Sequence, residues 1–260
     1  MAYPTVLTHF QYKLIKSSLA EYVPRLRKYS LLEIINAILF VMKTGCQWYM
    51  LPKDFPPYRI VYHHWRSLCD RHIITTLLHE LVKGKRAASG KDTDPAAAVI
   101  DSESVRWGVP NSDKGIDGHK RIKGIKRHIA VDEDGLPLAI HVTKANLHDS
   151  KGAVPLINRQ LRHWPGIQLI KGDQGYRGLV DQSSLFNTAL TIETVKSNFG
   201  TSEFIPIDGR WVVERTISWF TGTRRMLRNY EKYLHTAAHM VQTCMMAFML
   251  RYFRQAYQPR

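Results

Sequence analysis

Three acidic residues stand at positions where a fold could bring their side chains to one point. Asp101 follows the short apolar run "AAAVI", and Asp173 follows the run "IQLIKG". Glu214 lies 41 residues beyond Asp173, inside a run with helical periodicity. Converging carboxylates repel one another unless a cation lies among them, and their hard oxygens suit Mg²⁺ or Mn²⁺. Two such ions could activate a water or sugar hydroxyl and stabilise the leaving oxygen of a phosphodiester.

Each acid alone also has an ordinary structural interpretation. An aspartate after a strand is often a turn or helix cap, and a helical glutamate is most often solvated. His63 and His64 are adjacent, so they do not share a helix face and are poor joint metal ligands. Only the combination of the three acids with a basic surface predicts phosphodiester chemistry.

The charge of the chain supplies that surface. Thirty-seven Lys and Arg against 22 Asp and Glu give a net charge of +15 over 260 residues, which favours nucleic acid over membrane as the partner. The run "KGIDGHKRIKGIKRH" is the most basic stretch, although it could also be a solvated loop. Phosphate contacts of this type give affinity without sequence choice. In this run we predict DNA contacts at Lys120, Lys123, Lys126 and Arg127.

The cysteines indicate a reducing compartment. Cys46, Cys69 and Cys244 are far apart and have no metal-ligand spacing. The N-terminus lacks a signal-peptide pattern, and the most apolar segment, "MVQTCMMAFMLRYF", is too short to span a bilayer. We therefore expect a cytoplasmic protein with no membrane partner.

The pattern of the chain changes near residue 90. Residues 1–90 contain four amphipathic helical runs, the first two preceded by the capping residues Thr8 and Ser30, and Gly45 ends the second. We interpret this part as a small N-terminal all-α DNA-binding domain, although plain helical packing explains the same pattern.

Residues 91–260 have the pattern of an α/β domain. We expect strands at 96–101, 167–170 and 192–196, a hairpin over 128–142, and helices at 148–161, near 178–189 and from about 209. This order predicts a mixed sheet covered by helices, with the first and fourth strands as neighbours. Asp101 and Asp173 would then face each other at a common edge, and Glu214 would approach from the last helix.

Several segments resemble, in order and spacing, the DDE transposases of bacterial insertion sequences of the family numbered five. They are "VIDSESV", "GHKRIKGIKRHIAVDEDGLPLAIHVTKANLHDSKGA", "KGDQGYRG" and "RWVVERTISWFTGTRRMLRNYE". The segment "TGCQWYMLPKDFPPYRIVYHHWRSL" is similar to the N-terminal domain of the same proteins, so the resemblance covers nearly the whole chain. It implies a ribonuclease-H-like mixed sheet flanked by helices, and a catalytic and metal-binding triad of Asp101, Asp173 and Glu214.

The resemblance also implies how the triad binds two Mg²⁺ or Mn²⁺ ions. Asp101 would bridge the ions, Asp173 would be the second ligand, and Glu214 would complete the shell of the second ion. Gly172 and Gly175 would allow unusual backbone angles and the close approach of DNA around Asp173.

The helix motif of the family, composed of Tyr, Arg, Glu and Lys, is matched only in part. Arg210 lies one turn before Glu214, where it would hold a phosphate. Ile207 and Thr221 occupy the tyrosine and lysine positions. We expect the lysine to be replaced by Arg224, Arg225 or Arg228.

The expected activity is transposition. The protein would bind the terminal inverted repeats of its element in double-stranded DNA, cleave the ends and join the 3′ hydroxyls to target DNA, without a covalent enzyme intermediate. The family implies a homodimer on paired ends, in the bacterial cytoplasm at the nucleoid. Two alternatives stay open: a plain metal-dependent nuclease, and a transposase-derived DNA-binding protein without catalytic activity.

Overall fold

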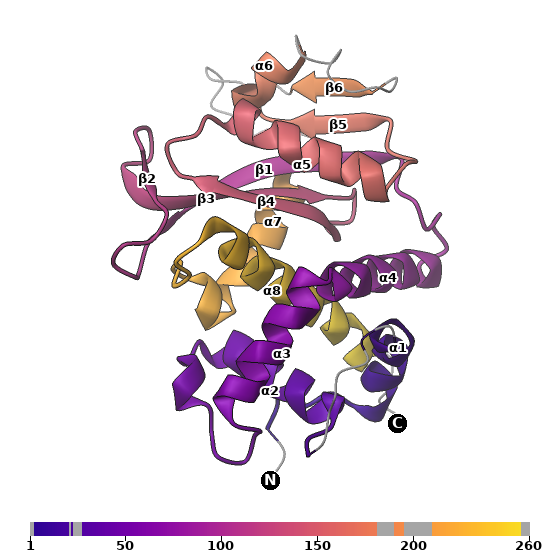
Figure 1. Ribbon diagram of the computed structural model, residues 1–260. Coiled ribbons are helices and arrows are strands. Elements are labelled where there is room, and N and C mark those ends of the chain that lie inside the picture. Colours follow the sequence, from indigo (N-terminus) through magenta and orange to yellow (C-terminus); the bar gives the residue numbers. More distant parts are fainter. Residues whose placement is uncertain (1–2, 21, 23–27, 181–189, 195–209, 256–260) are drawn as a thin grey trace. The chain divides into compact units, whose positions relative to one another are not determined.

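The computed structural model describes residues 3–20, 22, 28–180, 190–194 and 210–255, which form two compact units (Figure 1). The helical unit comprises the described parts of Met1–Lys85, Thr221–Leu227 and His239–Arg260. The sheet unit comprises the described parts of Arg86–Phe220 and Arg228–Ala238. The two units are described separately below.

The helices of the helical unit begin where the sequence predicts. Thr8 caps the first helix in a capping box with Gln11, and Ser30 caps the second in the same way with Glu33. Gly45 ends the second helix with a φ of 69°, which favours glycine. The elements are α1 (His9–Leu19), α2 (Leu31–Thr44), η1 (Trp48–Met50), α3 (Tyr58–Asp70), α4 (Ile73–Ala88, to Lys85), η4 (Arg224–Met226) and α8 (Leu234–Gln255, from His239).

The C-terminal helix supplies part of the core of the helical unit. The buried Trp65 of α3 donates its indole N–H to Thr243 of α8 at 3.0 Å, and Gln11 of α1 donates to the carbonyl of Leu250 at 2.7 Å. The first division between the two compact units falls after Lys85, and Thr221–Leu227 and His239–Arg260 belong to the helical unit; the domains 1–90 and 91–260 stay a prediction. The sequence did not indicate that α8 belongs to the helical unit, because its contacts are with residues more than 170 positions away, such as Trp65.

The sheet unit has a mixed sheet of six strands: β1 (Ala97–Arg106), β2 (Gly115–Asp117), β3 (Ile122–Val131), β4 (Pro137–Lys144), β5 (Leu169–Gly172) and β6 (Thr191–Thr194). β3 pairs antiparallel with β1 along one edge and with β4 and the short β2 along the other. β1, β5 and β6 follow one another in parallel. The helix α5 (Asp149–His163) packs on β3 and β4 (Figure 1).

The predicted fold, a ribonuclease-H-like mixed sheet flanked by helices with an N-terminal all-α region, is confirmed. Three details differ. β1 continues through Arg106. Its partly exposed Asp101 and Glu103 alternate with the buried Ser102 and Ser104, and the strand stays paired with β3. β2 was not predicted, and the late helix is divided into α7 (Arg210–Thr221) and α8. Of the helix expected at 178–189, α6 (Arg177–Val180) contains the start, and residues 181–189 lie outside the described residues.

No helix within the described residues has both the length and the apolar composition needed to cross a membrane.

Candidate active site

Asp101 and Asp173 lie on two neighbouring strands at the same level of the sheet. β1 and β5 are parallel, and Val99 pairs with Lys171, so each aspartate lies two residues further along its own strand direction. Asp173 directly follows the end of β5, as predicted. Asp101 lies in the middle of β1 and not at its end, because pairing with β3 continues to Arg106. The expected adjacency of the first and fourth strands therefore holds.

The turn after β5 is built around Asp173. Its Oδ1 accepts a hydrogen bond from the N–H of Gly175 at 2.9 Å and caps the short helix η2 (Gln174–Tyr176). A side chain on Gly172 would approach the ring of Tyr176 to 2.8 Å, and one on Gly175 would approach Asp173 Oδ1 to 3.0 Å. Neither glycine has a positive φ. The expectation of unusual backbone angles was therefore wrong, and close approach within the protein explains both glycines.

Tyr176 marks the point at which three carboxylates converge. Its side chain is 1% exposed, and its hydroxyl has no hydrogen bond of standard geometry among the described residues. Burial raises the pKa of Tyr176 well above its ordinary value, and the negative charges of Asp101, Asp149 and Asp173 raise it further, opposed by a contact with Ser102. Three carboxylates, from β1, α5 and the β5 turn, thus act electrostatically on one buried phenol, but their oxygens do not all lie within 4.8 Å of one another.

Asp149 was missed by the sequence analysis. It is the first residue of α5, and its Oδ1 accepts hydrogen bonds from Ser102 Oγ and Lys126 Nζ, both at 2.8 Å. An acid in the first turn of a helix is common, so its position gave no distinct signal. The only available signal was its place in "ANLHDSKGA", a segment quoted for the family resemblance.

Lys126 is buried and bound to carboxylates. Its Nζ lies 2.8 Å from Asp149, 3.7 Å from Asp117 and 3.0 Å from the carbonyl of Leu147. Although burial opposes ionisation, hydrogen bonds from Ser104 and the backbone, together with Lys126, lower the pKa of Asp117 to about 2. Burial likewise opposes ionisation of Asp149, but Lys126 and Ser102 hold the pKa of Asp149 below its ordinary value. Both acids are therefore carboxylates at neutral pH.

His128 does not add positive charge to this region. It is fully buried on β3, and its ring packs so closely on α5 that a side chain at Gly152 would approach it to 2.2 Å. Burial lowers the pKa of His128 to about 3, with Asp149 opposing and His141 and Lys126 reinforcing the shift. The imidazole is therefore neutral near pH 7.

The basic run expected to contact DNA divides into two parts. Lys120 and Lys123 are exposed, at the β2–β3 turn and at the start of β3. Lys126 and Arg127 are buried in β3, and Arg127 pairs with Glu103 at 3.2 Å. From Gly124 to Val131 every residue of β3 is buried, on both faces of the strand, whereas Lys123 is exposed, so spacing in the sequence could not reveal this difference.

Glu214 lies on α7, which the β3–β4 turn helps to position. Thr216 Oγ1 donates to the carbonyl of Gly135 at 2.8 Å, and a side chain at Gly135 would approach Val212 to 3.2 Å. Glu214 is exposed on this helix, and Arg210 is its first residue. The approach of Glu214 to the two aspartates stays a prediction.

The remaining arginines predicted to contact DNA differ in exposure. Arg224 and Arg225 belong to the helical unit, and Arg228 belongs to the sheet unit. Arg224 and Arg228 are exposed, whereas Arg225 is 6% exposed. Ile207 lies outside the described residues, and Thr221 is the last residue of α7.

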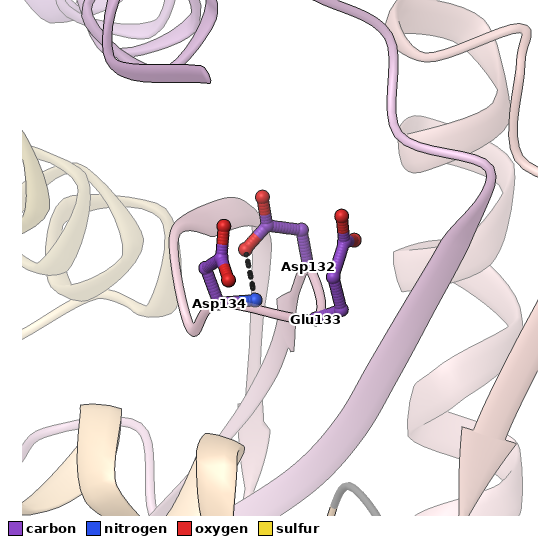
Figure 2. Close-up of side chains that lie close together, drawn as sticks. All are labelled: Asp132, Glu133 and Asp134. Carbon is purple, nitrogen blue, oxygen red and sulfur yellow. Dashed lines mark hydrogen bonds between the residues drawn. The ribbon is translucent and has the colours of Figure 1, made fainter. Parts of the chain in front are cut away.

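A second acidic group lies in the β3–β4 turn, where Asp132, Glu133 and Asp134 have carboxylate oxygens within 4.8 Å of one another (Figure 2). Asp132 Oδ1 accepts from the backbone N–H of Asp134 at 3.0 Å, an ordinary turn contact. Arg86 pairs with Asp132 and Glu133, and Lys91 pairs with Glu133 and Asp134. Two cations thus bind the three carboxylates, so the cluster is a turn anchored by ion pairs.

The acids around Tyr176 instead have the donor chemistry of a divalent-cation site. Asp101, Asp149 and Asp173 offer hard carboxylate oxygens, the donor type that Mg²⁺ and Mn²⁺ prefer. At the same place, the buried hydroxyl of Tyr176 has no hydrogen bond of standard geometry among the described residues. Oxygen ligands of this kind are suited to binding metal and a phosphodiester together.

Comparison with known proteins identifies relatives of both parts of the chain. A family model described as "Transposase DDE domain" matches residues 92–203, which include Asp101, Asp149 and Asp173 and end before Glu214. A model described as "Putative transposase of IS4/5 family" matches residues 7–78. A protein of Burkholderia cepacia, described as "Putative transposase for insertion sequence element IS402", is 32% identical over 164 residues, which cover 57% of this chain and 73% of that protein.

Proposed function

Because the chain belongs to the DDE transposases of IS4/5-type insertion sequences, we propose that it binds the terminal inverted repeats of its own element, cleaves the DNA at the element ends and joins the 3′ ends to target DNA. The observation that supports this proposal is that Asp101 and Asp173 occupy matching positions on adjacent parallel strands and that both charges act on the buried Tyr176. Both aspartates fall within the part of the chain that matches the DDE domain.

In this proposal Asp101 and Asp173 hold the metal, and Glu214 completes the set from α7. DDE transposases use divalent metal ions. One or two Mg²⁺ or Mn²⁺ ions would lower the pKa of a water or 3′ hydroxyl and neutralise the leaving oxygen. The chain's own contribution is orientation: Gly175 N–H fixes Asp173, and Ser102 N–H fixes Asp101 at 2.7 Å.

The DNA would be held by exposed cations. Lys120 and Lys123 lie on the sheet unit beside the β2–β3 turn, and Lys123 also lies over the ring of Trp107. Lys126 and Arg127 hold buried carboxylates, so we assign them a role in ordering the sheet and not in phosphate contact. The other phosphate contacts in this proposal are the exposed Arg224 and Arg228, together with Arg210 at the start of α7.

The helical unit would contribute recognition of the element ends, and α3 is the best-suited helix. It buries Val61 and Trp65 against its own unit and exposes Arg59, Tyr62 and His63 on its other side. Exposed cationic and aromatic residues on one helix face suit the phosphates and base edges of a major groove. A homodimer on paired ends remains part of the proposal.

The test is a reaction with labelled DNA that carries the element ends, with and without Mg²⁺, scored separately for binding, end cleavage and joining to a target plasmid. We expect all three, with cleavage and joining dependent on the metal. Cleavage without joining would identify a plain nuclease. Binding of the ends without either reaction in the presence of Mg²⁺ or Mn²⁺ would identify a non-catalytic DNA-binding protein.

A further inference from the structure

We propose that Asp149 is a further ligand of the metal site, held in place by the buried Lys126. This inference rests on the function proposed above, because it concerns the same site. The acids that a sequence comparison would select are on β1, after β5 and on α7, whereas Asp149 opens α5.

The two oxygens of Asp149 have different surroundings. Oδ1 accepts from Ser102 Oγ and Lys126 Nζ, both at 2.8 Å, which fixes the orientation of the carboxylate. Within the described part of the chain, Oδ2 accepts no hydrogen bond. A side chain at Gly175 would lie 3.5 Å from Asp149 Oδ2 and 3.0 Å from Asp173 Oδ1, so the two carboxylates border the same small space.

Tyr176 gives independent support for a ligand in this space. Its hydroxyl is buried and has no hydrogen bond of standard geometry among the described residues. The charge of Asp149 acts on that hydroxyl together with the charges of Asp101 and Asp173. Apart from its contact with Ser102, this buried hydroxyl has no hydrogen-bond partner among the described residues, so a polar atom is left for a bound group.

The charges of the network also favour a cation. Lys126 is shared between Asp149 and Asp117, and the neutral His128 adds no charge. One lysine thus faces two carboxylates, so this buried group keeps a net negative charge. Metal ligands in proteins are commonly held in position by hydrogen bonds from neighbouring side chains. Lys126 and Ser102 hold Asp149 in this way through Oδ1 and leave Oδ2 for the metal.

The test compares Asp149→Asn with the matched control Asp134→Asn in the full chain without DNA. Asparagine keeps an acceptor for Ser102 and removes the charge, whereas Asp134 is an exposed acid of the β3–β4 turn. Free Mn²⁺ is titrated by electron paramagnetic resonance, and the rise of the melting temperature with added Mn²⁺ is measured in parallel. We expect Asp149→Asn to weaken Mn²⁺ binding by about tenfold or more and to reduce the rise, and Asp134→Asn to leave both unchanged.

A lower melting temperature without metal, combined with unchanged Mn²⁺ affinity, would show that Asp149 only joins α5 to β1 and would overturn the inference. An equal loss in Asp134→Asn would also overturn it, because the signal would then come from the exposed turn. Asp101→Asn and Asp173→Asn separate the two proposals. If they lose Mn²⁺ and Asp149→Asn keeps it, only the inference fails; if none of the variants changes binding, or the wild type binds no Mn²⁺, the metal site itself fails.

Discussion

Asp101 and Asp173 stand at matching positions on adjacent parallel strands, each two residues beyond the pair formed by Val99 and Lys171. Their relative position is therefore set by strand pairing and not by a long loop. Strand pairing holds Asp101 rigidly within β1, whereas Asp173 lies just beyond the end of β5. The position of Asp173 should therefore depend on the packing beneath the β5 turn.

Replacing Gly172 by alanine tests that packing. The new methyl group would lie 2.8 Å from the ring of Tyr176 and 3.2 Å from Ile100, and both neighbours are buried. We expect Gly172→Ala to lower the free energy of unfolding by about 1–3 kcal/mol, measured by urea denaturation. Gly178→Ala is the control, because its methyl would meet only Ser150 at the ordinary distance of 3.7 Å. Equal stability of the two variants would contradict the close packing of Tyr176.

Lys126 and Lys123 lie on the same strand and should respond differently to loss of charge. Lys126→Met leaves Asp149 and Asp117 without their buried partner, so we expect a loss of about 3 kcal/mol in the free energy of unfolding. Lys123→Met should leave stability unchanged and weaken DNA binding, with a smaller dependence on salt concentration. Chemical denaturation and a salt titration of DNA binding measure the two effects. The reverse pattern would restore Lys126 as a DNA contact.

The stability of the sheet unit should decrease as the pH falls below 7, partly because of His128. The unfolded chain binds a proton at this residue near pH 6.5, whereas the folded protein does so only near pH 3. The stability contributed by the neutral imidazole is thus complete above about pH 6.5 and decreases toward pH 3. Between pH 7 and pH 5 this single group should account for a loss of about 2 kcal/mol.

The matched measurement uses His128→Gln, unfolded with urea at pH 7 and at pH 5. The variant should lose about 2 kcal/mol less than the wild type between these pH values, whatever its stability at pH 7. Groups that do not interact with His128 are common to both proteins, so their contributions cancel in the comparison. Identical pH dependence in the two proteins would show that His128 titrates normally in the fold.

We expect the exposed face of α3 to contribute to the affinity for the element ends. Arg59→Ala removes an exposed cation from this face, and we expect about tenfold weaker binding of the terminal repeats with no change in stability. Lys16→Ala, an exposed lysine of α1, is the matched control in the same unit. Gel-shift titrations at constant salt compare the two. Equal effects would mean that the unit binds DNA only through its overall charge.

The sequence was most informative where local physics determines the structure. Thr8, Ser30 and Gly45 marked helix ends because caps and left-handed residues act on their own neighbours. The Asp-Gly pair in the β3–β4 hairpin is a local signal of the same kind. These features fixed the order of elements, and from that order the neighbouring positions of β1 and β5 were predicted correctly.

Features that depend on distant residues could not be read in the same way. Asp149 of α5 is held by Ser102 of β1 and Lys126 of β3, two residues that are distant from it in the sequence. The burial of Lys126 depends on α5 and on Asp117, so its place in a basic run could not reveal its ion pairs. The assignment of α8 to the helical unit likewise depends on contacts between the two ends of the chain.

The central claim is that Asp173 binds a metal ion that DNA cleavage requires. Asp173→Cys tests it directly, because a thiolate binds the softer Mn²⁺ much better than it binds Mg²⁺. We predict that this variant still binds the element ends, cleaves them at less than about one hundredth of the wild-type rate with Mg²⁺, and recovers cleavage with Mn²⁺. Cleavage by Asp173→Cys at the wild-type rate with Mg²⁺ would contradict the account.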